Sequence, residues 1–177
     1  MLDVGAWYRL QQFWQIITAQ PLTEEAWTAV THILPTAAQQ QLFRQLAFSD
    51  QWHSVRVMET LQSAEHNDPD LLVAALLHDV GKTKLRLTLW DRTLIVLLSF
   101  FWPRKVDEWG RGNGRDWRRP FVVKARHPEW SAEMAAAVGC SPLSVSLMRR
   151  HQDKLPETAV TSEDQLLRVL QWADDQN

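Results

Sequence analysis

Apolar residues recur at three- and four-residue intervals along most of this chain, which is the spacing of one face of an α-helix. Near the start, this pattern predicts three helices, over residues 7–17, 23–34 and 36–47, which Pro21 and Pro35 separate. No group of residues in this part suggests chemistry. We therefore interpret residues 1–48 as an N-terminal helical extension.

The next helix is expected over residues 53–64. Val57 and Leu61 lie four and eight residues after His53, so these three side chains share one helical face. An apolar face of this kind is normally buried against the rest of the protein. His53 is therefore expected to point inward.

A strongly apolar helix should follow over residues 71–77. Asp68-Pro69 is a good start signal, because aspartate caps the first free N–H groups and proline fits the first turn. The helix is apolar on nearly every face, which predicts a central position, and it runs out at Gly81. His78-Asp79 then lies in its last turn, at the edge of the core.

Three further helices complete the pattern, over residues 127–139, 141–151 and 161–173. The first is expected to open at His127-Pro128-Glu129 and to end at Gly139. No stretch shows the alternation of apolar and polar residues that is typical of strands. The expected fold class is therefore all-α.

The segment over residues 85–126 has a different composition. It combines an apolar run over 94–102 with a stretch rich in glycine, tryptophan and arginine, and its ten basic residues against four acidic ones give it a net charge of +6. Three interpretations of this basic insertion stay open. It contacts an anionic substrate, it rests peripherally on an anionic membrane through residues 94–119, or it is a solvated loop beside a normally packed helix.

Length and composition narrow the protein class. A chain of 177 residues is long enough for one domain with a real core. The net charge of −2 and the lack of a specific nucleic-acid motif argue against a general nucleic-acid coat. The single cysteine, Cys140, excludes an internal disulfide and suits a reducing compartment. Without a recognisable signal peptide or a run of ~20 apolar residues, the expected location is the cytoplasm.

The candidate chemistry begins at His78-Asp79, where an imidazole and a carboxylate close a strongly apolar segment. Ionisable groups placed there cost desolvation energy unless something binds them. A divalent metal ion is the usual solution, because neutral imidazole and carboxylate are good ligands. Further candidate ligands occur upstream and downstream, in the order H…HD…H…H…D: His53, His127, His151 and Asp174.

This order, with its local text, resembles the HD superfamily of metal-dependent phosphohydrolases, and most closely its HDIG-type subgroup. The core motif appears as His78-Asp79-Val80-Gly81-Lys82, with Val80 in place of the usual isoleucine. The other matching segments are His53-Ser54-Val55-Arg56-Val57, His127-Pro128-Glu129-Trp130-Ser131-Ala132, Arg149-Arg150-His151-Gln152 and Ala173-Asp174. The resemblance covers about residues 49–175 and implies an HD-domain helical bundle over residues 49–177.

The resemblance also implies a set of metal ligands. One divalent ion would be held by His53, His78, Asp79 and Asp174, although the adjacent Asp175 stays an alternative for the last position. In binuclear members of the family two more histidines bind a second ion that Asp79 bridges, and in mononuclear members they serve the substrate. His127 and His151 have these places here. Nitrogen and oxygen ligands suit Mn, Fe, Ni, Co, Mg or Zn, so one or two ions of open identity are expected.

The resemblance assigns Asp79 and Lys82 to catalysis, and Lys82 also to the grip on a phosphate, although a lysine at a helix end is also favoured by the helix dipole. Arg56, three residues after His53, is a second candidate for substrate binding, or a solvated helix arginine. The expected function is hydrolysis of a phosphomonoester or phosphodiester, in a small molecule of the nucleotide class, by metal-activated water. Two alternatives stay open: a diiron oxygenase with the same ligands, and a non-catalytic nucleotide-binding regulator.

Overall fold

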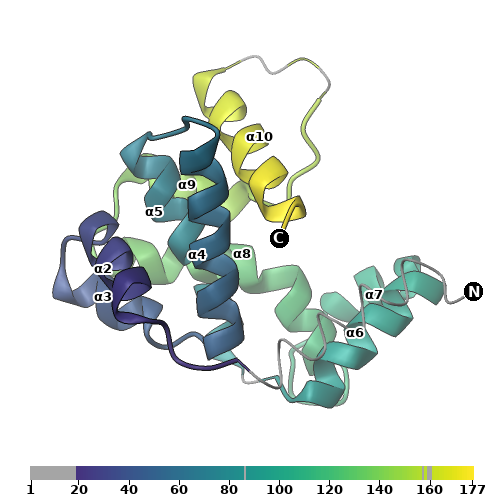
Figure 1. The fold of residues 1–177 in the computed structure, drawn as a ribbon. Coiled ribbons are helices and arrows are strands. Elements are labelled where there is room, and N and C mark those ends of the chain that lie inside the picture. The colour runs from purple at the N-terminus through teal and green to yellow at the C-terminus, as the bar shows by residue number, and fades with distance from the viewer. Residues whose placement is uncertain (1–18, 86, 157, 159–160) are drawn as a thin grey trace, which may run out of the picture.

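The computed structural model describes residues 19–85, 87–156, 158 and 161–177, and every regular element in these residues is a helix (Figure 1). The all-α fold class is thereby confirmed for this part of the chain. The elements are α2 (Glu24–Ile33), α3 (Ala37–Phe43), α4 (Phe48–Ser63), α5 (Pro69–Leu77), the 3₁₀ helix η1 (Val80–Lys84), α6 (Leu89–Phe101), α7 (Pro103–Gly110), α8 (Arg119–Ala137), α9 (Pro142–Arg150) and α10 (Ser162–Asp175).

Helix α5 is the centre of the bundle. It packs against α2, α3, α4, α9 and α10, so the solvent reaches little of it. Its side chains Leu71, Ala74 and Leu77 are fully buried, as the apolar pattern of this helix predicts. The expected start is also confirmed, because the Asp68 carboxylate accepts hydrogen bonds from the N–H groups of Asp70 and Leu71.

The described part of residues 1–48 packs on this same core. Val30, Leu34 and Phe43 are fully buried in one cluster with the side chains of α5. Helix α3 ends at Phe43 rather than at residue 47, and the chain continues into a turn. The helix expected over residues 7–17 lies outside the described residues. The domain boundary at residue 48 stays a prediction.

The expected helix start at His127-Pro128 is wrong. Helix α8 begins at Arg119, so His127 lies in its interior and Pro128 is a proline inside a helix. Proline has no N–H, which leaves the Lys124 carbonyl, four residues earlier, without its helical donor. The His127 ring donates to this carbonyl from Nδ1 at 3.0 Å. The helix therefore tolerates the proline, and the histidine gains an anchor.

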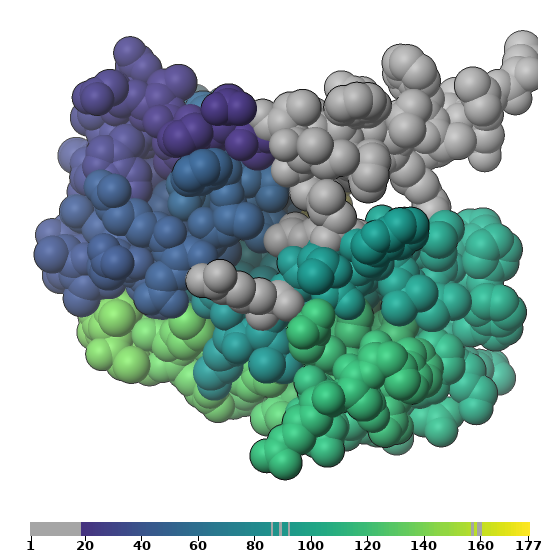
Figure 2. Space-filling model, turned by 90° about the horizontal axis from the view of Figure 1, so that it is seen from below, coloured from purple at the N-terminus to yellow at the C-terminus, as the bar shows by residue number. Residues whose placement is uncertain are grey.

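Helices α6 and α7, with the start of α8, form the basic insertion. They stand off from the bundle in Figure 1, and their teal and green atoms form a lobe on one side of the molecule in Figure 2. Two polar contacts join α6 to α8: Lys124 donates to Ser99 at 2.8 Å, and Arg119 pairs with Asp91 at 2.7 Å. Among the described helices, none is long and apolar enough to cross a membrane.

Candidate metal centre

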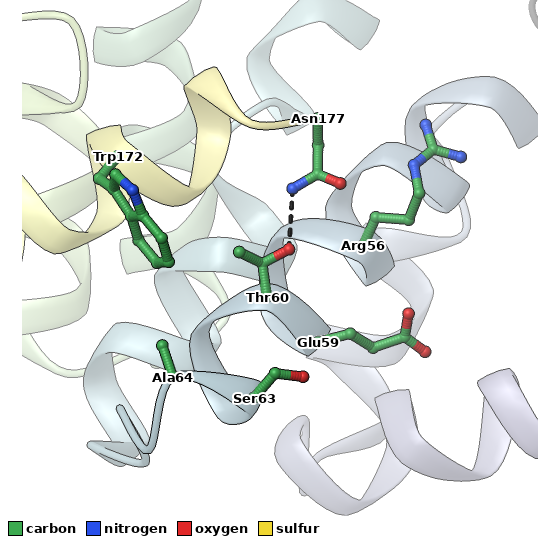
Figure 3. A pocket seen from close by; sticks show the side chains of 7 residues that line it. All are labelled: Arg56, Glu59, Thr60, Ser63, Ala64, Trp172 and Asn177. Atoms are coloured by element: carbon green, nitrogen blue, oxygen red, sulfur yellow. Dashed lines mark hydrogen bonds between the residues drawn. The ribbon is translucent and has the colours of Figure 1, made fainter.

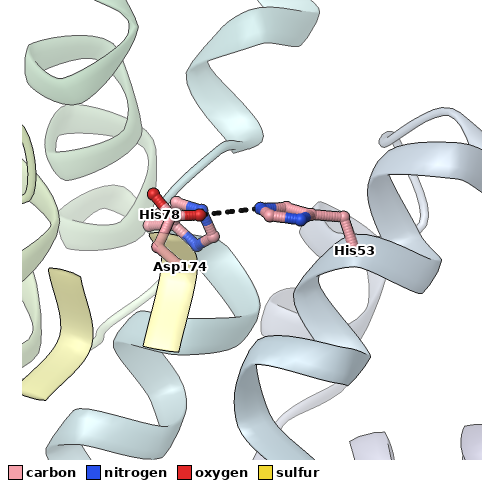
Figure 4. Close-up of side chains that lie close together, drawn as sticks. All are labelled: His53, His78 and Asp174. Carbon is pink, nitrogen blue, oxygen red and sulfur yellow. Dashed lines mark hydrogen bonds and ion pairs between the residues drawn. The ribbon is translucent and has the colours of Figure 1, made fainter. Parts of the chain in front are cut away.

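The six candidate ligands lie together in the helical bundle. They form two groups of three, and the ligand atoms within each group lie within 4.8 Å of one another. The first group is His53, His78 and Asp174 (Figure 4), and the second is Asp79, His127 and His151. The structure therefore brings together every residue of the expected ligand set. Their role as ligands stays a prediction.

Five elements deliver these side chains. His53 extends from the middle of α4, and His78 is the C-cap of α5, with Asp79 directly after it. His127 lies inside α8, and His151 is the C-cap of α9. Asp174 comes from the last turn of α10, where Asp174 is half-buried and Asp175 is exposed. Exposure therefore favours Asp174 over Asp175 as the last candidate ligand.

In the first group, the Asp174 carboxylate approaches two imidazoles. Its Oδ1 lies 2.9 Å from His53 Nε2, the contact drawn in Figure 4, and 3.5 Å from His78 Nε2. His78 Nε2 is also 3.6 Å from Asp79 Oδ2. His78 therefore lies between the two carboxylates and connects the two groups.

In the second group, two imidazole nitrogens face each other. His127 Nε2 and His151 Nε2 are 3.2 Å apart, and His127 Nε2 is 3.3 Å from Asp79 Oδ1. All three side chains are almost completely buried. Two lone pairs at this distance repel unless a proton or a cation lies between them, so this arrangement suits a shared positive charge.

Backbone carbonyls fix the orientation of three of the rings. His78 Nδ1 donates to Ala75 at 2.9 Å, His127 Nδ1 to Lys124 at 3.0 Å, and His151 Nδ1 to Met148 at 2.7 Å. A carbonyl can only accept, so in the neutral ring the hydrogen is on Nδ1 and the lone pair is on Nε2. This is the arrangement in which metal-binding histidines are usually held.

His78 provides the test of whether a metal fits. Its side chain is 1 % exposed, and Nε2 is buried without a hydrogen-bond partner among the described residues. An unsatisfied buried nitrogen costs about 1–3 kcal/mol, so a protein keeps one only where something else binds it. Together with the carboxylates of Asp79 and Asp174, this nitrogen makes a donor set that fits a divalent ion.

The charges of the metal-free site follow from burial and from the neighbouring ions. Burial alone would lower the pKa of His78, but the Asp79 and Asp174 carboxylates outweigh it and raise this pKa to about 9. Burial also lowers the pKa of His151, to about 3, and the charge interactions with the neighbouring His78 and His127 act in the same direction. Burial would raise the pKa of Asp79, but Lys82 and His78 hold it well below its ordinary value.

Metal binding should therefore depend on pH below about pH 9. A metal ion binds the neutral ring. The pKa of His78 is about 9, so at a lower pH the metal must displace the His78 proton. We expect the apparent affinity to rise about tenfold per pH unit and to level off above pH 9, with about one proton released per ion at pH 7. Calorimetry in buffers of different ionisation enthalpy measures that release. An affinity that is constant from pH 7 to 9 would contradict this assignment.

The two expected substrate residues lie in different places. Lys82, in η1, forms an ion pair with Asp79 and is partly exposed, so it lies at the mouth of the second ligand group. Arg56 lies one turn beyond His53 on α4 and lines a cavity of about 440 Å³ between α4 and the end of α10 (Figure 3). None of the ligand residues lines that cavity, and Thr60 and Asn177 share a hydrogen bond of 3.0 Å there. Arg56 as a substrate residue stays a prediction.

The sequence reasoning missed the positioning role of Ser131. The Gly81 N–H donates to Ser131 Oγ at 2.8 Å, which fixes η1 against α8 beside the ligands. A Cβ on Gly81 would lie 2.2 Å from the His127 carbonyl oxygen. Both residues belong to motifs that the sequence contains, Gly81 to the HDVGK motif and Ser131 to the segment that begins at His127. Only the structure shows that these two motifs are in contact.

Of three comparisons with known proteins, one found a match. No match was found among the curated proteins or among the solved structures. The family model described as HD domain matches residues 52–175, a range that includes all six candidate ligands and covers more than half of the chain. The chain therefore belongs to the HD domain family of metal-dependent phosphohydrolases.

Proposed function

We propose that this protein hydrolyses a phosphomonoester or phosphodiester of the nucleotide class with one or two divalent metal ions, as an HDIG-type member of its family. The observation that carries the proposal is the buried Nε2 of His78, which faces two carboxylates and has no hydrogen-bond donor among the described residues. With the other five candidate ligands it makes up two compact groups. This donor set favours a metal-dependent reaction over simple packing.

Each residue has a distinct part in the proposal. His53, His78, Asp79 and Asp174 hold the first ion, and His127 and His151 hold a second ion with Asp79 or contact the substrate. A bound divalent cation supplies Lewis-acid activation of water and offsets charge on the phosphoryl group. Lys82 places an ammonium group beside Asp79, from where it orients a phosphate oxygen.

A cavity beside Lys82 suits the rest of the substrate. It has a volume of about 510 Å³, which is in the usual range for small-molecule sites, and Lys82, Thr83 and Asp50 line one part of it. Arg44 and Gln45, between α3 and α4, line another part. Two cationic residues, Lys82 and Arg44, line this cavity. This supports an anionic substrate that Lys82 contacts at the phosphate and Arg44 contacts at a second group.

The experiment compares Asp174→Asn with Asp175→Asn. These neighbours on α10 differ in position, because Asp174 contacts two imidazoles and Asp175 is exposed. We expect Asp174→Asn to lower both the bound metal, measured by mass spectrometry, and the hydrolysis of a phosphoester panel by about 100-fold or more. Asp175→Asn should leave both within about twofold. Loss of a ligand carboxylate explains the difference.

The same measurement separates the alternatives. Predominantly iron, with O₂ consumption and no phosphoester turnover, would replace the hydrolase by a diiron oxygenase. Bound metal without turnover on any phosphoester would favour a nucleotide-binding regulator. If Asp174→Asn changed bound metal and turnover no more than Asp175→Asn does, Asp174 would not belong to the site.

A further inference from the structure

Helix α6 exposes a row of large apolar side chains to the solvent. Trp90, Leu97 and Phe101 lie seven and four residues apart, so they share one face, and they are 82 %, 49 % and 61 % exposed. The opposite face carries Asp91 and Ser99, whose side chains bond to Arg119 and Lys124 of α8. An ordinary surface helix buries its apolar stripe, so an exposed row of this kind is unusual.

The apolar surface continues past the end of α6. Phe100 and Trp102 are 66 % and 56 % exposed, and the rings of Phe100, Phe101 and Trp102 contact one another at centroid distances of 5.1 and 5.7 Å. Contiguous exposed aromatic groups of this size mark an interaction surface. This exposure favours an interaction surface over the interpretation in which this helix packs in the ordinary way. We call Trp90, Val96, Leu97, Phe100, Phe101 and Trp102 the α6 face.

Basic residues follow the α6 face along the chain. From Pro103 to Arg119 there are six basic residues against three acidic ones. Arg104, Arg111 and Arg115 are exposed and form no ion pair with any described residue. Residues 85–126 carry a net charge of +6, which leaves −8 on the rest of a chain of net charge −2. The lobe therefore attracts an anionic surface, while the bundle is repelled from it.

We propose that the α6 face docks on an anionic membrane surface, with its aromatic side chains at the headgroup level and the basic residues of α7 and the following loop against the lipid charges. Tryptophan and phenylalanine on one helix face, with arginine and lysine beside them, are the composition of peripheral membrane helices. Each basic residue near an anionic leaflet adds to the affinity. Because α6 has 13 residues and is too short to span a bilayer, it lies on the surface.

Charge favours this occupant over a second copy of the chain. In a symmetric dimer through the α6 face, the +6 lobes of two copies would approach each other. An anionic membrane supplies the opposite charge over the whole lobe, so it satisfies the apolar and the basic groups together.

The test is co-sedimentation of the full-length protein with vesicles of phosphatidylcholine alone and of phosphatidylcholine with phosphatidylglycerol. We expect binding to the anionic vesicles only, weakened by salt. Trp90→Gln combined with Phe101→Gln should lower it at least about tenfold, and Arg111→Gln combined with Arg115→Gln by about tenfold with a smaller salt dependence. Trp172→Gln removes an exposed tryptophan on α10 and should change nothing. All these side chains are exposed, so the variants should fold.

Three results would overturn the proposal. Equal binding to neutral and anionic vesicles would remove the role of the basic residues. A dimer in analytical ultracentrifugation that Trp90→Gln with Phe101→Gln dissociates, without vesicle binding, would identify a second copy as the occupant. A monomer that binds no vesicles would leave the α6 face without a membrane partner.

Discussion

Replacing His78 by alanine should lower the metal affinity by about 100-fold or more, and hydrolysis at limiting metal by a similar factor. A site of four protein ligands is worth ~10–16 kcal/mol in well-measured cases, so one ligand accounts for ~3 kcal/mol, or about 100-fold. His78 is the most sensitive position, because its Nε2 lies within 3.6 Å of both Asp79 and Asp174 and so connects the two groups. Mass spectrometry of the purified protein and metal titration of the apoprotein measure the change.

The control for this substitution is His66→Ala. His66 lies in an exposed loop between α4 and α5 and is in neither ligand group, so its loss should change metal content by less than about twofold. If His78→Ala retained metal with the wild-type affinity while remaining folded, the first ligand group would be wrong, whatever the substrate is.

Much of the fold was readable from local signals in the sequence. The cap at Asp68 and the apolar turns of α5 both predicted the element that is present. These signals act over three or four residues, so they need no knowledge of the tertiary structure. The ligand set was readable in another way, from the order and text of its motifs, and all six residues are close together in space.

The remaining features depend on contacts between distant segments. Pro128 normally starts a helix, but here the His127 ring satisfies the Lys124 carbonyl that the proline leaves free, so α8 continues through it. The apolar run of α6 predicts burial from composition alone, whereas polar contacts from Asp91 and Ser99 join the helix to α8 and its largest aromatic side chains are exposed. The continuation of α8 through Pro128 and the exposure of α6 cannot be predicted from the sequence of one helix. Each depends on contacts with residues of another turn or element.

Gly81→Ala should destabilise the protein by about 3 kcal/mol and reduce its metal content, because there is no room for a methyl group. The new Cβ would lie 2.2 Å from the His127 carbonyl oxygen and 2.7 Å from the Ser131 N–H nitrogen, both in the backbone of α8. Overpacking against side chains costs about 1–3 kcal/mol, and a helix backbone yields less readily than a side chain. The alternative is that η1 moves away from α8, which separates Asp79 from His127 and breaks the bond from Gly81 to Ser131.

Gly139→Ala is the comparison that isolates this clash. Gly139 has a φ of 77° and no atom within 4 Å of the added Cβ, so alanine there costs only the backbone strain of about 1 kcal/mol. Urea unfolding of the metal-free variants gives both free energies, and metal titration shows whether the site has moved. If Gly81→Ala lowered the free energy of unfolding no more than Gly139→Ala does, and left the metal affinity unchanged, η1 and α8 would not pack this closely. Gly81 of the HDVGK motif would then be needed for the conformation of the turn, and not for the close packing of η1 on α8.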